Sequence, residues 1–265
     1  MSSLLDAVTA AARRAADERE RTASPGELEQ LAAGRRGAGV RFGDALAAPG
    51  IRIIAECKRR SPSRGILRQD YDTEAIATGY QASGAAAVSV LTEPTFFDGS
   101  LDHLRAVRKA VTLPVLRKDF IVTPFQILEA AAAGADAVLL IVASLDQAEL
   151  RALSQEARRL NLDALVEVHD RRELDRALDA GATIVGVNSR NLRTLEVSLD
   201  VFDRLAGHIP DGVVAVAESG LRTADDLRRL STLRYDAFLI GERFMTMPDP
   251  GAALAGLLRE AGGTA

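Results

Sequence analysis

Between Ile51 and Gly241, the chain alternates eight times between a short apolar run and a longer stretch with helical spacing. Each run is rich in β-branched residues or leucine and stops near a polar residue or a glycine. Strands buried on both faces are apolar throughout, and strands that alternate with helices form parallel sheets. The pattern therefore predicts an α/β protein built as a single (β/α)8 barrel, or TIM barrel.

The ends of the apolar runs carry the polar residues best suited to chemistry. In a parallel barrel all strands deliver their last residues to one rim, where barrel enzymes hold their active sites. Alternate strand residues face the same side, so Glu56 and Lys58 point together while Cys57 points toward the helices. The same parity predicts that one rim gathers Glu56, Lys58, Lys118, Glu167, Asn188, Arg190 and Glu218.

Two lysines and three glutamates in one concavity are expected to shift one another's pKa values, which suits general acid and base catalysis. For any one of these residues, the alternative is an ordinary ion pair at the barrel end or a cap on the next helix. That alternative explains the whole set less well, because charges gathered without a function repel or desolvate one another. We therefore expect this rim to be an active site.

Two glycine-containing loops predict where a phosphate binds. Ser219-Gly220 follows the seventh apolar run, and Gly241-Glu242 follows the eighth. Loops at these positions form the usual phosphate site of TIM barrels, because glycine lets backbone N–H groups approach the anion. We expect Glu242 to face the ligand with its backbone N–H, since its carboxylate repels a phosphate.

Further residues complete the predicted pocket. Arg190 is suited to a charge-assisted contact with the phosphate, and a loop containing Ser61 and Pro62 follows the first strand over the same rim. Phe97 and Phe120 are candidates for apolar walls around a flat ring, although ordinary core packing explains them equally well.

Composition limits the classes of partner. The 265 residues carry a net charge of -4, so no overall field attracts nucleic acid or acidic membranes. Residues 1–21 hold no apolar run long enough for a signal peptide or a membrane span, so a cytoplasmic location is expected. One cysteine, and three histidines without ligand spacing, predict no metal site.

The length fits one barrel with a short addition in front of it. Residues 1–48 precede the first strand and contain two stretches with helical spacing, one from Leu4 and one opened by Ser24-Pro25. We expect residues 1–48 to form an N-terminal helical extension and residues 49–265 to form the barrel.

Six strings of this sequence, taken in order, resemble the indole-3-glycerol phosphate synthase family. They are ECKRRSPSRG (56–65), LRKDF (116–120), LVEVH (165–169), VNSRNL (187–192), AESG (217–220) and FLIG (238–241). The resemblance covers nearly the whole chain. The strings after the first, third and sixth strands are the most specific, whereas AESG and FLIG are common among phosphate-binding barrels.

The resemblance implies that 1-(2-carboxyphenylamino)-1-deoxyribulose 5-phosphate closes to an indole with loss of carbon dioxide and water, and that no cofactor is needed. Lys118 is then the general acid at the carbonyl oxygen. Lys58 holds the substrate carboxylate and donates a proton during dehydration, for which Glu167 is the base or proton relay. Glu56 and Asn188 then tune the lysines and bind hydroxyls, and Glu218 is a further polar member of this catalytic network.

The same resemblance implies pocket walls and a cover. Leu139 and Leu192 line the pocket, Ser61 contacts the substrate, and the N-terminal extension packs over the barrel mouth. The segment from Phe42 to Leu46 is expected to help exclude water from the site. The expected partner is a phosphorylated small molecule, and the chain is expected to be a monomer or a weak homo-oligomer.

Three other functions stay open on the residues alone. Another phosphosugar isomerase needs one acid and one base, whereas this rim offers two lysines. A Schiff-base aldolase uses a neutral lysine as its nucleophile. A barrel that binds a metabolite without catalysis is the third alternative, and an assay for indole formation distinguishes it from the others.

Overall fold

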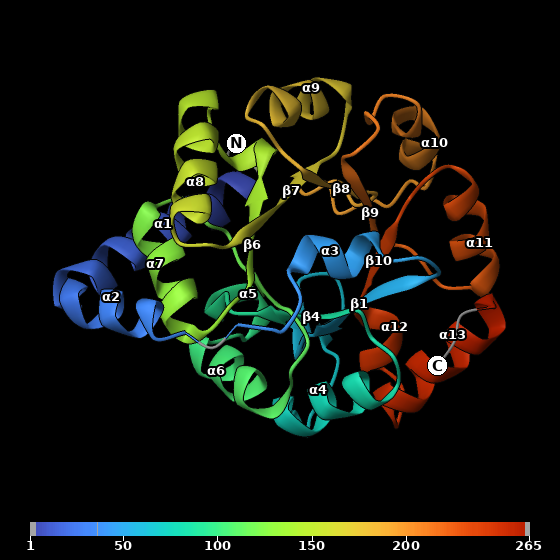
Figure 1. Ribbon diagram of the computed structural model, residues 1–265, viewed down its shortest axis with the longest axis horizontal. Helices are drawn as coiled ribbons and strands as arrows, with labels where there is room; N and C mark the ends of the chain where they lie inside the picture. The colour runs from blue at the N-terminus through green and yellow to red at the C-terminus, as the bar shows by residue number, and fades with distance from the viewer. Residues whose placement is uncertain (1–3, 36, 263–265) are drawn as a thin grey trace.

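The computed structural model describes residues 4–35 and 37–262, and its centre is a closed barrel of eight parallel strands (Figure 1). The strands are β1 (Arg52–Cys57), β4 (Ala87–Leu91), β5 (Val115–Lys118), β6 (Ala137–Ile141), β7 (Asp163–Val168), β8 (Ile184–Asn188), β9 (Val214–Glu218) and β10 (Ala237–Ile240). Consecutive strands are neighbours, and β10 closes the ring by pairing with β1. The predicted TIM barrel is confirmed.

Helices surround the barrel and alternate with its strands, as Figure 1 shows. They are α4 (Thr73–Ala82), α6 (Leu101–Ala110), α7 (Pro124–Ala133), α8 (Gln147–Arg159), α9 (Arg171–Asp179), α10 (Asp200–Ala206), α11 (Ala224–Thr232) and α13 (Pro250–Ala261). Local signals fix several of their first residues: Thr123 with Gln126, and Asp146 with Glu149, form capping boxes at α7 and α8.

Strand side chains alternate between two apolar layers. Ile54, Leu116 and Leu165 point into the barrel, whereas Ile53 belongs to the layer between strands and helices. Cys57 lies in this outer layer, where complete burial raises the pKa of its thiol. The prediction that Cys57 faces the helices is confirmed, and a buried thiol of this kind is unreactive.

Several short elements around the barrel ends were not predicted. They are α5 (Pro94–Phe97), α12 (Glu242–Met245), the 3-10 turn η1 (Val142–Ser144), and the hairpin of β2 (Arg60–Ser61) with β3 (Gly65–Ile66). Each has four residues or fewer, which is too short to show a helical or alternating period. The buried Glu93 carboxylate caps α5 by accepting the backbone N–H groups of residues 95–97.

The first two helices run along the outside of the barrel. In α1 (Leu4–Thr22), Arg13 pairs with Glu149 at 2.8 Å and Arg19 pairs with Glu129 at 2.6 Å. These carboxylates belong to α8 and α7, and α2 (Pro25–Ala33) packs on α7. The extension is therefore attached through ion pairs and helix packing to one side of the barrel.

The third helix, α3 (Phe42–Ala47), closes the floor of the barrel, meaning the end at which the strands begin. Phe42 and Leu46 are fully buried in the interior apolar cluster with Ile184, the first residue of β8. Figure 1 shows α3 lying across the centre of the ring. The prediction that Phe42 to Leu46 helps to close the mouth is wrong, because these side chains fill the apolar opposite end.

Asp136, directly before β6, connects three segments at the floor. Its carboxylate accepts the backbone N–H of Val115 at 2.9 Å and of Ala38 at 3.0 Å, and it pairs with Arg108 at 2.7 Å. The carboxylate is mostly buried, with 11% of the side chain exposed. The start of β5, the end of α6 and the N-terminal segment therefore share one acceptor.

We predict that Asp136→Ala lowers the free energy of unfolding by about 2–3 kcal/mol, because it leaves a buried guanidinium and two buried N–H groups without their acceptor. Urea unfolding measures this loss. The control is Asp102→Ala, which removes an exposed pair with Arg105 and is expected to change stability by less than ~0.5 kcal/mol. Equal effects of the two substitutions would contradict the connecting role of Asp136.

Candidate active site

A cavity of about 1080 Å³ opens at the end of the barrel where the strands finish. Of the predicted site residues, it is lined by Glu56, Lys58, Phe97, Lys118, Phe120, Leu139, Glu167, Asn188, Arg190, Leu192, Glu218, Ser219, Gly220, Gly241 and Glu242. Ser61 and Pro62 line a smaller adjoining cavity of about 80 Å³, which also contacts Lys58 and Leu5 of α1. Residues separated by most of the sequence therefore meet at one rim.

The centre of the cavity holds one lysine between two buried carboxylates. Lys118, at the end of β5, places its Nζ 3.5 Å from Glu167 Oε2 and 3.7 Å from Glu218 Oε2. Glu167 is the residue before the last of β7, Glu218 is the last of β9, and only 1% of each side chain is exposed. A charge buried this deeply is stable only when a partner of opposite sign lies beside it.

Burial and the neighbouring charges give Lys118, Glu167 and Glu218 different protonation states. Burial lowers the pKa of Lys118, but the Glu167, Glu218 and Glu56 carboxylates raise it above its ordinary value overall. Burial raises the pKa of Glu167, but Lys118, His169 and a hydrogen bond from Asn188 hold it below its ordinary value. Burial and the nearby Glu167 charge raise the pKa of Glu218 to about 8. At neutral pH the site therefore holds an ammonium, a carboxylate and a protonated carboxyl group.

A second ion pair lies on β1 and just beyond it. Lys58 Nζ is 2.6 Å from Glu56 Oε1, and both side chains line the main cavity. The carboxylate needs space beside β10, since a Cβ added to Gly241 would lie 2.3 Å from Glu56 Oε1. Gly241 is therefore required by the close approach of the Glu56 side chain as well as by its position in the loop after β10.

A buried network on the outer face of β5 holds the backbone that carries Lys118. Arg117, with only 1% of its side chain exposed, pairs with Asp119 at 2.9 Å and with Glu129 of α7 at 3.4 Å. Thr92 donates its hydroxyl to the same Asp119 oxygen. These contacts anchor the odd-numbered side chains outside the barrel, so Lys118 and Phe120 are directed into the cavity.

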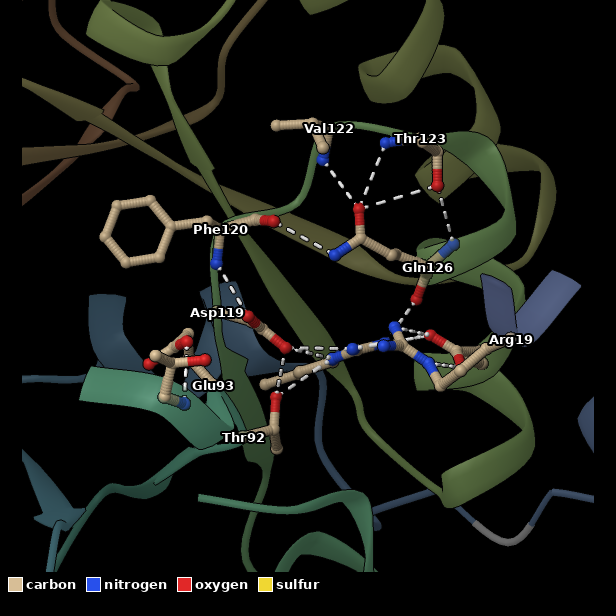
Figure 2. Close-up of polar contacts among 11 residues, drawn as sticks. Arg19, Thr92, Glu93, Asp119, Phe120, Val122, Thr123 and Gln126 are labelled. Atoms are coloured by element: carbon tan, nitrogen blue, oxygen red, sulfur yellow. Dashed lines mark hydrogen bonds and ion pairs between the residues drawn. The ribbon is translucent and has the colours of Figure 1, made fainter. Parts of the chain in front are cut away.

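Figure 2 shows how this network continues after the strand. The Phe120 backbone N–H donates to Asp119 Oδ1 at 2.8 Å, and the Gln126 side chain donates to the Phe120 carbonyl at 2.9 Å. In the same view, the Phe120 ring points away from the polar groups. Its ring centroid lies 6.5 Å from that of Phe97, and both rings line the main cavity. The two phenylalanines thus form an apolar wall.

The last residue of β8 contributes an amide, and the loop after it contributes a guanidinium. Asn188 Oδ1 accepts the backbone N–H of Arg190 at 2.9 Å, and the Asn188 amide donates to Glu167. The Arg190 guanidinium donates to the Leu195 carbonyl at 3.2 Å and lines the main cavity. These contacts fix the loop next to the Glu167 carboxylate.

The loop after β9 bends through two consecutive left-handed residues, Ser219 with φ 68° and Gly220 with φ 74°. A side chain at Gly220 would also collide, because a Cβ there would lie 2.8 Å from Val197 and from Leu199. In the loop after the neighbouring strand β10, the Glu242 carboxylate pairs with Arg64 of the β2–β3 hairpin at 2.9 Å. The negative charge of Glu242 is therefore matched by an arginine.

The sequence patterns missed some residues of this region. Arg64 and Glu93 line the main cavity. Arg64 was predicted only as part of a loop, and Glu93 caps α5, which was not predicted. His169, two residues after Glu167, received no predicted function. Its ring lies between Glu167 and Glu173, a carboxylate of α9. Strand parity was the available signal for His169, while Glu173 needed the packing of α9 against β7.

Two kinds of feature are absent from residues 4–35 and 37–262. No group of three or more histidine, cysteine or acidic side chains in that part of the chain is arranged to hold a metal ion. No helix there is long and apolar enough to span a bilayer.

Solved structures of similar shape share the barrel but little sequence. A protein named KGPDC from Streptococcus mutans aligns with a TM-score of 0.63 at 13% identity, covering 81% of this chain and 98% of that one. Thiamine phosphate pyrophosphorylase from Pyrococcus furiosus aligns with a TM-score of 0.60 at 16% identity, over 83% and 98%. At this identity the likeness shows the fold alone.

Sequence comparison is more specific. The family model of indole-3-glycerol phosphate synthase matches residues 5–257. An indole-3-glycerol phosphate synthase of Parafrankia sp. (strain EAN1pec) is 56% identical over 218 residues, which is 81% of each chain. That of Mycolicibacterium vanbaalenii is 48% identical over 257 residues, or 97% of this chain and 94% of the relative. The chain therefore belongs to the indole-3-glycerol phosphate synthase family of carboxy-lyases.

Proposed function

We propose that the chain converts 1-(2-carboxyphenylamino)-1-deoxyribulose 5-phosphate into indole-3-glycerol phosphate, carbon dioxide and water, with Lys118 as the general acid. The observation that carries these residue roles is the position of Lys118 between Glu167 and Glu218, in the same cavity as the Lys58–Glu56 pair. One cavity thus offers two ammonium groups, a base and a protonated acid to a single substrate.

The cavity has an end for each part of the substrate. Its phosphate binds at the backbone N–H groups of the loops after β9 and β10, which contain Ser219, Gly220, Gly241 and Glu242, with Arg190 adding charge. Its aromatic ring lies against an apolar wall. The residues proposed to form this wall are Phe97, Phe120, Leu139 and Leu192, with Ser61 and Pro62 in the adjoining cavity.

Ring closure requires the ring carbon that carries the carboxylate to attack the ribulose carbonyl, whose oxygen then gains charge. The raised pKa of Lys118 keeps it protonated at neutral pH, so it donates a hydrogen bond and then a proton to this oxygen. Lys58 binds the substrate carboxylate until carbon dioxide leaves, and Glu56 orients the Lys58 ammonium from 2.6 Å.

Dehydration follows in the same cavity. Glu167, whose pKa is lowered, is ionised and takes the proton that the sugar carbon must lose, while Asn188 holds its carboxylate in place. Lys58 donates a proton to the leaving hydroxyl group. Glu218 stays protonated near neutral pH, and it therefore adds no second negative charge beside Lys118 that would hold the proton back.

The charge of Lys118 also disfavours a Schiff-base aldolase. A lysine nucleophile must be neutral to attack a carbonyl, and the carboxylates around Lys118 raise its pKa instead. Borohydride trapping with the substrate is accordingly expected to give no covalent adduct at this residue.

One chain supplies every residue in this proposal, so we propose that the monomer is a complete catalytic unit. We also propose that residues 1–48 act as an accessory to the barrel of residues 49–265. Leu5 and Val8 of α1 line the small cavity beside the mouth, whereas α3 serves only the floor.

We predict that Lys118→Ala lowers kcat by about three orders of magnitude, within the ~10²–10⁴ range of lost general acid catalysis, while the fold is retained. The assay follows indole absorbance after mixing enzyme with the carboxyphenylamino deoxyribulose phosphate. The control Lys109→Ala removes an exposed lysine of α6 and keeps wild-type turnover. Near-normal turnover of the Lys118 variant would remove this residue from its proposed role.

We predict that Arg190→Ala chiefly raises KM, by roughly tenfold, because it removes one charge-assisted contact to the phosphate and leaves the reacting groups in place. Steady-state kinetics on the same substrate separate KM from kcat. Arg204→Ala, an exposed position on α10, serves as the matched control. An unchanged KM would make Arg190 a structural residue of the loop after β8.

Glu218 predicts a pH dependence of stability. Between its ordinary pKa of 4.5 and about 8, the group is protonated in the folded protein but ionised in the unfolded chain. Its contribution is therefore fully present below 4.5 and is lost as the pH rises through about 8. Glu218→Gln cannot ionise, so its stability relative to wild type is expected to rise across this window and to level off above it.

Urea unfolding of both proteins at a series of pH values checks this expectation. Glu20→Gln, an exposed position on α1, is the control and should differ from wild type by the same amount at every pH. A difference between Glu218→Gln and wild type that does not vary with pH would show that Glu218 is ionised in the folded protein.

A further inference from the structure

The proposed reaction consumes one proton from solution in each turnover. The carbonyl oxygen takes up one proton during ring closure, and the resulting hydroxyl takes up a second when it leaves as water. The sugar carbon returns one proton to the base. Carbon dioxide leaves from an ionised carboxylate and its bonding electrons stay on the ring, so this step releases no proton. The two lysines and Glu167 therefore end each cycle one proton short.

A chain of titratable groups leads from Lys118 away from the main cavity. Glu167 Oε2 faces Lys118, and Glu167 Oε1 lies 3.4 Å from His169 Nε2. On the other side of the ring, His169 Nδ1 lies 3.0 Å from Glu173 Oε2. The same Glu173 oxygen accepts the His169 backbone N–H at 2.8 Å, which holds the ring between the two carboxylates.

This row of titratable side chains crosses the wall between two cavities. Glu167 lines the main cavity, whereas His169 and Glu173 line a second cavity of about 500 Å³ beside it. Four exposed side chains also line the second cavity and open it to solvent: Asp170, Arg172, Asn191 and Arg193. His169 Nε2 and Glu167 Oε1 are both buried and have no hydrogen-bond partner, and they face each other across 3.4 Å.

We propose that His169 is a positioning residue that holds Glu167 and exchanges one proton with it during each turnover. The proposal rests on the function assigned to Glu167 above. After ring closure, the N–H bond at His169 Nε2 breaks and an O–H bond forms on Glu167, which turns and gives this proton to neutral Lys118. The ring keeps its Nδ1–H bond toward Glu173. After dehydration, Glu167 returns the proton of the sugar carbon to His169 Nε2, and Lys58 takes the one proton consumed in the turnover from solvent.

The charges around the ring favour this transfer near neutral pH. Burial lowers the pKa of His169, but the hydrogen bond to Glu173 and the charge of Glu167 raise it above its ordinary value overall. The raised pKa favours the protonated ring, which is the form that can give a proton to Glu167. The other charged groups around the ring and its cavity are Glu218, Lys118, Asp170, Arg172, Arg176 and Arg193.

The test replaces His169 with glutamine, which keeps a polar side chain but relays no proton. We expect His169→Gln to lower kcat between about tenfold and a hundredfold with KM little changed, because substrate contacts are intact. Added imidazole, which is small enough to enter the second cavity, is expected to restore part of kcat. His208→Gln, at an exposed position, is the control and should neither lose activity nor respond to imidazole.

Glu173→Gln tests the same relay with the histidine present. Loss of the Glu173 charge lowers the pKa of His169, so the alkaline limb of the kcat profile is expected to move to lower pH. This variant also decides the outcome if His169→Gln does not fold. An unmoved limb would overturn the relay, and so would wild-type kcat or a failure of imidazole rescue in a folded His169→Gln protein. If wild-type enzyme forms no indole product, the proposed function fails instead.

Discussion

The candidate active site depends on one ammonium group held between two buried glutamates inside the barrel. Lys118 lies within 4 Å of both Glu167 and Glu218, and the two glutamates are almost completely buried. Such groups are stable only together, since loss of one partner leaves an uncompensated buried charge. The arrangement also makes the two glutamates unequal, with Glu167 ionised and Glu218 protonated near neutral pH. Acid and base functions thus arise from one cluster.

The rest of the barrel supports this cluster from outside. On β5, charged side chains point both ways: Lys118 enters the cavity, and Arg117 enters the network of Asp119 and Glu129 in the helix layer. Arg19 of α1 pairs with the same Glu129, so the N-terminal helix contributes to the surroundings of this strand. Charges on the outer face therefore fix the backbone from which the inner lysine projects.

Much of this could be predicted because strand parity and parallel topology are simple geometry. The prediction failed in segments whose apolar residues show no helical or alternating period. Phe42 and Leu46 resemble any apolar pair, and only their packing against Ile184 shows that α3 closes the floor. Elements such as α5 and the β2–β3 hairpin were too short to recognise. His169 was in register with Glu167, but its partner Glu173 belongs to the following helix, and the contact exists only after α9 packs.

The amino-acid sequence by itself determined the barrel, its rim and the residues on that rim, because local periodicity sets which side chains share a face and parallel strands end together. Family membership likewise follows from sequence strings and is confirmed by comparison. The tertiary structure alone decided which charges pair and which titrate together. Electrostatic interaction falls with distance and depends on burial, and neither quantity exists until the chain has folded.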